Sequence, residues 1–292
     1  MGKTPSALAK TAVARGRKDA DRVVARSRAR LERRAVKAAG ARATAGVLVA
    51  EGDSWFDYPM HDVLKALEDD HGFDVESVAH RGDRVEDMAY ADGQLDDLAR
   101  RLEKLLRRRV LPRAILLSGG GNDIAGTEFH LLLNHARSAI AGVNESVARG
   151  IIDERIRFAY IHILAAVTRL CDAIAGTRIP ILTHGYAYPT PDGRGVLGGW
   201  WFLPGPWLEP GFRDKGFHDV GENRRLMRHL IDRFNAVLVE VSAMPGFTHV
   251  RYVDLRPTLP AGKGYKKLWA NELHPTPRGF ALVAGKIAAA IP

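Results

Sequence analysis

Hydrophobic and polar positions follow a regular block pattern from residue 46 onward. Short apolar runs alternate with longer segments whose apolar residues recur at helical spacing, and the runs occupy residues 46–50, 73–79, 114–118, 179–183 and 249–253. Such alternation is typical of βα units, in which helices cover both faces of a parallel sheet. The pattern therefore predicts a three-layer α/β/α fold with a five-stranded parallel sheet of flavodoxin-like strand order.

The segments between the runs predict the helices of this fold. Helical spacing, with glycine or proline at several boundaries, is found over residues 60–70, 85–108, 127–141, 144–175, 221–242 and 276–290. The longest of them repeats apolar side chains at Ile152, Ile156, Ala159, Ile163, Ala166 and Leu170. We interpret this stripe as core packing and not as a binding site.

One stretch, residues 185–220, breaks the block pattern. It is rich in glycine, proline and aromatic residues, and it holds three of the five tryptophans, namely Trp200, Trp201 and Trp207. A long connection inside a compact domain usually carries function. We expect an aromatic lid loop over a binding site, with a flap that merely covers a sheet edge as the alternative.

Charge is concentrated at the N-terminus. Residues 1–45 hold 13 Lys and Arg against 3 Asp and Glu, which leaves 30 against 31 for residues 46–292. We expect residues 1–45 to be a basic tail, helical or disordered, and residues 46–292 to be the folded domain. Contact with nucleic acid or an anionic membrane is expected through the tail only, and a purely solvated tail is the alternative.

The remaining composition excludes several classes of protein. The single cysteine, Cys171, rules out an intramolecular disulfide, and no run reaches the roughly 18 apolar residues of a membrane span. No HExxH or clustered histidine motif is present, and the glycines at 119–121 lack the GxGxxG spacing of a dinucleotide loop. We therefore expect a cytoplasmic protein without metal or cofactor.

Polar motifs follow four of the five predicted strands. The segments are Gly52-Asp53-Ser54-Trp55, His80-Arg81-Gly82-Asp83, Gly119-Gly120-Gly121-Asn122-Asp123 and, beyond a loop, Asn271-Glu272-Leu273-His274-Pro275. Ligands of open α/β sheets bind at the carboxyl ends of the strands, where these segments meet. A serine hydroxyl becomes a nucleophile when an imidazole takes its proton, so Ser54 and His274 predict acyl-transfer chemistry.

These motifs, in this order, resemble the SGNH (GDSL-type) serine hydrolases over residues 46–290. The resemblance implies Ser54 as the nucleophile and His274 as its base. It also implies an oxyanion hole formed by the backbone amides of Ser54 and Gly82 and by the side chain of Asn122. Such donors stabilise the tetrahedral intermediate by about 3 kcal/mol each.

The sequence departs from the family pattern three residues before His274. The family has an aspartate at this position, and this chain has Asn271. An amide oxygen can hold the histidine tautomer but stabilises imidazolium less than a carboxylate does. The orienting group is therefore Asn271, or else the neighbouring Glu272 or Asp254 beyond the fifth strand.

The substrate pocket is expected to include residues beside these motifs. We expect Asp53, Trp55 and Asp123 to contribute, together with His184, Trp200, Trp201 and Trp207. His184 can equally be a packed residue at the end of its strand. The prediction is a hydrolase that cleaves a small-molecule carboxylic ester with an apolar or aromatic group through an acyl-serine intermediate. Carbohydrate deacetylation and thioester hydrolysis stay open, and the rival is a non-catalytic binding module tethered by its basic tail.

Overall fold

The computed structural model describes residues 44–91, 93–126, 128–196 and 204–292. The basic tail up to residue 43 lies outside this description, as do Trp200 and Trp201 in the predicted lid loop. The fold below is that of the unit formed by Ala45–Pro292.

Five parallel strands form the central sheet. They are β1 (Val47–Gly52), β2 (Asp74–Ser77), β3 (Ala114–Ser118), β6 (Ile181–His184) and β7 (Val250–Val253). Their spatial order is β2-β1-β3-β6-β7, and every neighbouring pair is parallel. Both the strand positions and the flavodoxin-like order predicted from the sequence are confirmed.

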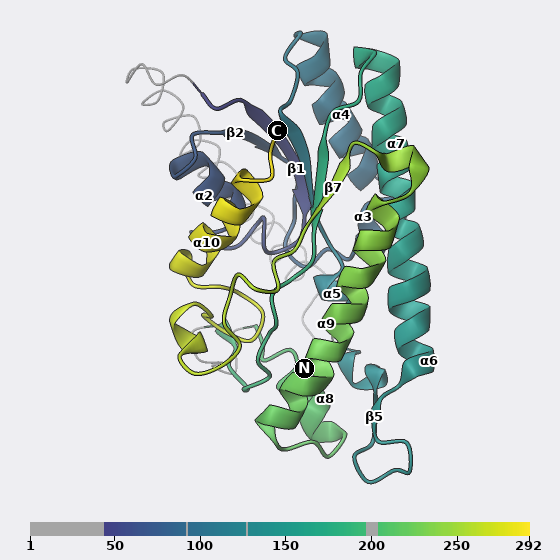
Figure 1. The fold of residues 1–292 in the computed structure, drawn as a ribbon, viewed down its shortest axis with the longest axis vertical. Helices are drawn as coiled ribbons and strands as arrows, with labels where there is room; N and C mark the ends of the chain where they lie inside the picture. Colours follow the sequence, from purple (N-terminus) through teal and green to yellow (C-terminus); the bar gives the residue numbers. More distant parts are fainter. Residues whose placement is uncertain (1–43, 92, 127, 197–203) are drawn as a thin grey trace, which may run out of the picture. The chain divides into compact units, whose positions relative to one another are not determined.

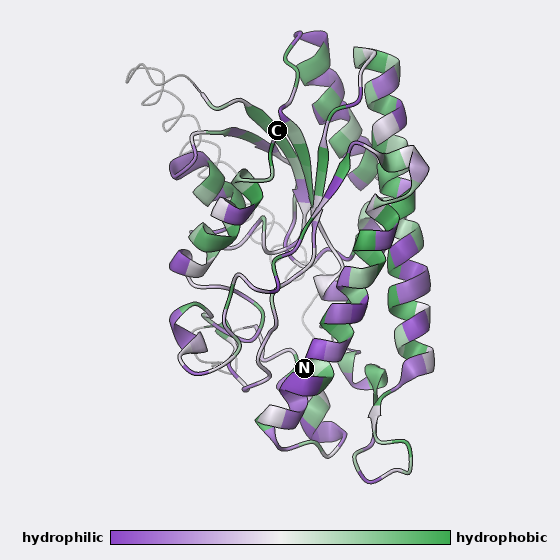
Figure 2. Cartoon of the chain, viewed as in Figure 1, coloured by the Kyte–Doolittle hydropathy of each residue, from purple (hydrophilic) through white to green (hydrophobic). Residues whose placement is uncertain are grey.

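Helices cover both faces of the sheet (Figure 1). Helices α2 (Val63–Asp69) and α10 (Pro277–Ala288) pack together on one face. The other face carries α3 (Val85–Tyr90), α4 (Gln94–Arg107), α7 (Arg157–Ala175) and α9 (Val220–Ser242). The strands are largely hydrophobic, whereas the helices alternate hydrophobic and hydrophilic faces (Figure 2). This division matches a parallel sheet that is buried on both sides.

The longest helix runs without interruption from Glu145 to Ala175. It consists of α6 (Glu145–Ala148), a π-helical stretch η2 (Arg149–Ile156) and α7. By length and apolar composition alone, this 31-residue helix could cross a membrane. Its apolar residues are used in the fold, because Ile152, Ile156 and Ile163 are buried and the helix contacts α3, α4 and α9. The predicted core role of its apolar stripe is confirmed.

One predicted helix, at residues 127–141, is wrong. The segment forms a short 3-10 turn η1 (Phe129–Leu132) and then an antiparallel pair, β4 (Leu133–Asn134) with β5 (Gly142–Val143). Its apolar residues do not make one stripe, since Leu132 is buried while Ile140 is exposed. The side chain of Asn134 also donates to the carbonyl of Ile140 and so competes with helical hydrogen bonding.

The predicted helix at 85–108 is interrupted between α3 and α4, where Ala91 is extended and Gly93 has a φ of 101°. The remaining short elements are α5 (Gly121–Ile124), α8 (Glu209–Asp214), and the 3-10 turns η4 (Pro245–Phe247) and η5 (Tyr265–Lys267). Helix α5 and the turn after β1 stand at the carboxyl edge of the sheet, where the sequence motifs meet.

A substitution at Gly120 can test how tightly this edge of the sheet is packed. Its φ is 98°, and a Cβ there would lie 2.6 Å from the ring of Phe234 in α9. Gly120→Ala should lower the free energy of unfolding by about 3 kcal/mol or more, because backbone strain and overpacking act together. Urea denaturation measures the change.

Gly150→Ala is the matched control, since nothing lies within 4 Å of a Cβ at that helical position. It should stabilise the protein by about 0.5–1 kcal/mol, the usual gain of alanine over glycine within a helix. Equal stabilities of the two variants would contradict the packing described here.

Candidate active site

The carboxylate of Asp53 fixes the turn that carries Ser54 through hydrogen bonds. Asp53 is 2% exposed, and its Oδ1 accepts hydrogen bonds from Ser118 Oγ at 3.1 Å and from the Trp55 amide at 3.0 Å. The hydroxyl of Tyr186 donates to the other oxygen. Burial raises the pKa of Asp53 to about 6, and these hydrogen bonds oppose the rise. The turn after β1 is thereby tied to the end of β3 and to the segment after β6.

A hydrogen-bonded chain of three side chains begins at Ser54. The Ser54 Oγ lies 2.8 Å from His274 Nε2, and His274 Nδ1 lies 3.0 Å from Asn271 Oδ1. An amide oxygen only accepts, so Nδ1 carries the proton and Nε2 is free to accept the proton of Ser54. These three side chains therefore have the geometry of a nucleophile, a base and an orienting group.

The imidazole of His274 is almost completely buried from solvent. The residue is 5% exposed, the phenol ring of Tyr58 stacks on it at 4.3 Å, and the indole of Trp207 meets it at 5.3 Å and 70°. Burial lowers the pKa of His274 to about 3. Because the folded histidine is neutral at ordinary pH, it is available as a proton acceptor.

Of the three candidates for the orienting group, Asn271 is the one that contacts His274. Its Oδ1 also accepts the backbone amides of Leu273 and His274, and its Nδ2 donates to the hydroxyl of Tyr58 at 3.1 Å. Glu272 instead accepts backbone amides from the loop between β6 and α8. The carboxylate of Asp254 pairs with Arg256.

Of the expected oxyanion donors, Asn122 lines the same pocket as Ser54. Among the described residues, no hydrogen bond uses the backbone amide of Ser54 or of Gly82, so both remain available. The Nδ2 of Asn122 donates one hydrogen to the carbonyl of Asp83 at 2.9 Å and keeps a second. Gly82 has a φ of 91°, and a Cβ at this position would meet no atom within 4 Å, so conformation, not crowding, calls for glycine here.

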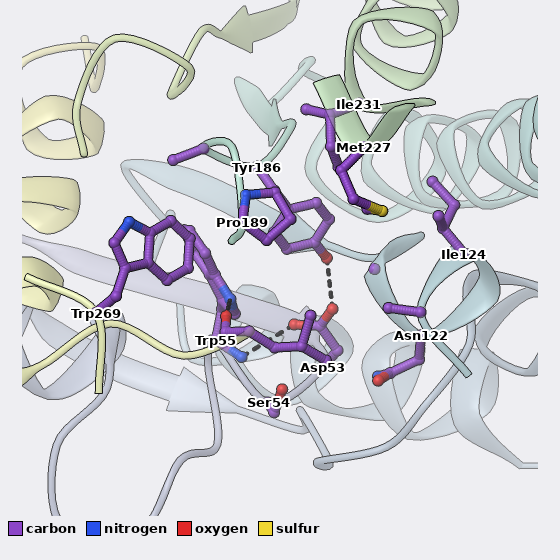
Figure 3. A pocket seen from close by; sticks show the side chains of 14 residues that line it. Asp53, Ser54, Trp55, Asn122, Ile124, Tyr186, Pro189, Met227, Ile231 and Trp269 are labelled. Carbon is purple, nitrogen blue, oxygen red and sulfur yellow. Dashed lines mark hydrogen bonds between the residues drawn. The ribbon is translucent and has the colours of Figure 1, made fainter. Parts of the chain in front are cut away.

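A small apolar pocket lies beside Ser54 (Figure 3). Its volume is about 40 Å³. The described residues that line it are Asp53, Ser54, Trp55, Gly121, Asn122, Ile124, Ala125, Tyr186, Ala187, Pro189, Met227, Ile231, Trp269 and Leu273. Most of these side chains are apolar, so the wall suits an apolar group next to a reacting ester.

Only some of the residues expected to bind substrate line the pocket. Asp53 and Trp55 reach the pocket, whereas Asp123 accepts the amide of Val85 at 2.9 Å and is not part of its lining. His184 is buried behind the Ser54 turn, where its ring lies 5.5 Å from that of Phe56. Trp207 contacts His274 and not the pocket wall.

Several residues of the site belong to no motif in the sequence. The ring of Tyr58 stacks on His274, and the hydroxyl of Tyr186 donates to Asp53 beside Ser54. Met227 and Ile231 line the pocket from α9. Tyr58 lies only four positions after Ser54, a proximity that could have drawn attention to it. The others are distant in sequence and are brought to the site by the fold alone.

The chain is similar to a family of known proteins and to several solved structures. A model of the GDSL-like lipase/acylhydrolase family matches residues 38–282. A protein from Slackia heliotrinireducens assigned to the SGNH hydrolases superposes with a TM-score of 0.51 at 13% identity, over 85% of this chain and 100% of that one. A catalytic mutant of an acetylxylan esterase from Geobacillus stearothermophilus superposes with a TM-score of 0.43 at 15% identity, over 86% of this chain and 95% of that one.

No curated protein matches the sequence significantly. At 13% identity, the similarity to the Slackia heliotrinireducens structure shows a shared fold only. The family match covers most of the chain and includes all four motifs. This chain therefore belongs to the GDSL-like lipase/acylhydrolase family and is an esterase-type or lipase-type hydrolase.

Proposed function

We propose that this protein hydrolyses a carboxylic ester through an acyl-serine intermediate on Ser54, with a short apolar acyl group. The observation that carries the proposal is the continuous chain from Ser54 Oγ through His274 to Asn271, with distances of 2.8 and 3.0 Å. The pocket beside Ser54 supports the choice of acyl group.

In the first half of the reaction, Ser54 Oγ attacks the carbonyl carbon and its proton passes to His274 Nε2. The carbonyl oxygen becomes an oxyanion, for which the amides of Ser54 and Gly82 and the second Nδ2 hydrogen of Asn122 are the proposed donors. The intermediate collapses when the alcohol leaves with the proton held by His274. An acyl group then remains on Ser54.

The second half repeats these steps with water as the nucleophile. His274 takes a proton from the water, the tetrahedral intermediate forms at the same donors, and Ser54 leaves with the proton. The products are a carboxylic acid and the original enzyme. Because His274 acts as a base in both halves, it must be neutral before each attack.

The volume of the pocket supports a short acyl group. One water needs roughly 10–15 Å³ of such space, so a cavity of about 40 Å³ holds about three water-sized groups. An acetyl or propionyl group fits this space. The apolar wall formed by Ile124, Met227 and Ile231 favours the methyl end of such a group.

The nucleophile assignment is tested with an activity-based probe. A fluorophosphonate should label the wild-type protein and fail to label Ser54→Ala, and both Ser54→Ala and His274→Ala should lose about three or more orders of magnitude in kcat. The melting temperatures should change little. Ser242→Ala, at an exposed helix end, is the control. More than a tenth of wild-type kcat in Ser54→Ala would refute the assignment.

The neutral orienting group is tested by Asn271→Asp. A carboxylate there would keep the contact with His274 Nδ1, and Tyr58 could donate to its second oxygen. We expect kcat/KM to rise about tenfold, because the added charge stabilises the imidazolium of the transition state by about 1.4 kcal/mol.

A pH profile of kcat/KM sharpens the same test. Activity is lost as pH falls through the pKa of His274, which burial holds near 3 in the wild type. The aspartate should raise this pKa and move the acidic limb upward by about one unit or more. Asp254→Asn is the control, since that carboxylate pairs with Arg256. If neither rate nor limb changed in Asn271→Asp, position 271 would not act on His274.

The acyl pocket is tested with p-nitrophenyl esters of rising chain length. The wild type should prefer acetate or propionate, and Met227→Ala should shift the optimum toward longer chains because it removes a buried side chain from the wall. Met244→Ala is the same substitution at an exposed position and should keep the wild-type order. An unchanged order in a folded Met227→Ala would exclude this pocket as the acyl site.

A further inference from the structure

Glu272 is a fully buried carboxylate that is satisfied by backbone amides alone. It is 0% exposed, and no described cation forms an ion pair with it. Oε1 accepts the amides of Gly193 and Glu209, both at 3.0 Å, and Oε2 accepts those of Trp207 at 2.7 Å and Leu208 at 2.8 Å. Each oxygen thus receives two N–H groups.

This geometry identifies the ionised form of Glu272. Burial raises the pKa of Glu272, and the four backbone hydrogen bonds oppose the rise. A protonated oxygen would have to point its hydrogen at an amide that is itself a donor, which the pattern of four donors does not permit. A buried negative charge without these donors would cost several kcal/mol, so the four amides and the carboxylate hold each other firmly in place.

Three of the four amides belong to the loop between β6 and α8, and the fourth is that of Glu209, the first residue of α8. Glu272 belongs to the turn formed by residues 269–275. A second set of contacts joins the same two segments. The guanidinium of Arg194 donates to the carbonyls of Trp269 and Ala270 at 2.9 and 3.1 Å, and the Glu272 amide donates to the Arg194 carbonyl at 3.2 Å. The loop is therefore fixed on the turn at residues 193–194 and again at 207–209.

The attachment at 207–209 reaches the reactive imidazole directly. The amide of Trp207 is bound to Glu272, and the indole of the same residue lies 5.3 Å from the ring of His274. Glu272 is two positions before His274 and one after Asn271, so one short turn carries the base, its orienting group and the loop anchor. Moving Trp207 would open one side of the imidazole to water.

We propose that Glu272 is a positioning residue, which holds Trp207 against His274 and thereby keeps the base dry and correctly placed. This inference rests on the proposed function of His274 as the general base. It assigns the conspicuous carboxylate beside Asn271 to the loop and not to the imidazole. A misplaced base commonly costs up to about a hundredfold in rate, so the effect is measurable.

The groups that face His274 make the pH profile a specific readout. Ser54 and Tyr58 come from the segment after β1, Asn271 from its own turn and Trp207 from the loop before α8. Of these groups, Ser54, Asn271 and Trp207 carry no charge at any working pH, and burial raises the pKa of Tyr58. Glu272→Gln also removes a nearby negative charge, which by itself would lower the pKa of His274, so a move of the acidic limb to higher pH reports hydration of the imidazole.

The experiment uses Glu272→Gln in the full-length protein. Glutamine keeps the shape, but its NH2 group meets two backbone donors and cannot accept from them. We expect kcat on p-nitrophenyl acetate to fall about 10- to 100-fold with a smaller change in KM. The acidic limb of kcat/KM should move to higher pH, because water then reaches His274. Arg213→Gln breaks an exposed pair with Glu209 in α8 and should behave as the wild type.

A second variant keeps the test decisive if Glu272→Gln does not fold. Trp207→Ala leaves the carboxylate intact and should reproduce both the loss of kcat and the upward shift of the limb. A normal rate and limb in folded Trp207→Ala would overturn the proposal, as would a Glu272→Gln protein that retains both. Probe labelling of the wild type at Ser54 is scored separately, so failure of the proposed hydrolysis is distinguished from failure of this inference.

Discussion

The buried carboxylate of Asp53 is the interaction on which the site depends. Its three hydrogen bonds come from Trp55 beside it, from Ser118 at the end of β3 and from Tyr186 just after β6. Losing one donor would leave a buried charge partly unpaired, so the sheet register that delivers these donors also fixes the Ser54 turn. The position of the proposed nucleophile is thus a consequence of how the strands pair.

On the side of His274, a second buried carboxylate, that of Glu272, plays a similar part. Glu272 accepts four amides from the loop before α8 and from the first residue of α8, as Asp53 accepts hydrogen bonds around the turn after β1. Neither carboxylate contacts the imidazole of His274 in a described interaction. These two carboxylates therefore hold the segments around the site in place, and the hydrogen-bonded chain from Ser54 to Asn271 is left formally neutral.

The sequence predicts the parts of this arrangement that have local signals. Apolar runs mark the strands, and the motifs at their ends identify Ser54, Asn122 and His274. The antiparallel pair of β4 and β5 escapes prediction because each strand has only two residues, which is too short for a period-2 pattern to be visible in the sequence. The anchoring by Glu272 could not be predicted, since its donors are backbone amides 63 to 79 positions away that carry no side-chain signature. The contact of Asn271 with His274, in preference to Glu272 or Asp254, likewise depends on the fold of the turn and has no signal in the sequence.

A neutral orienting group changes what the proposed base must rely on. Proton transfer from Ser54 creates an imidazolium in a site where burial already disfavours charge, and Asn271 offers only an amide dipole to oppose that cost. The phenol ring of Tyr58, stacked on the imidazole at 4.3 Å, supplies a second source of stabilisation through its negative face. Burial from water raises the free energy of the imidazolium, but it also strengthens this contact and the oxyanion hydrogen bonds, because both act in a low dielectric. On this proposal, the aromatic contacts of His274 compensate in part for the missing carboxylate, which explains why the imidazole is enclosed by rings and not by charges.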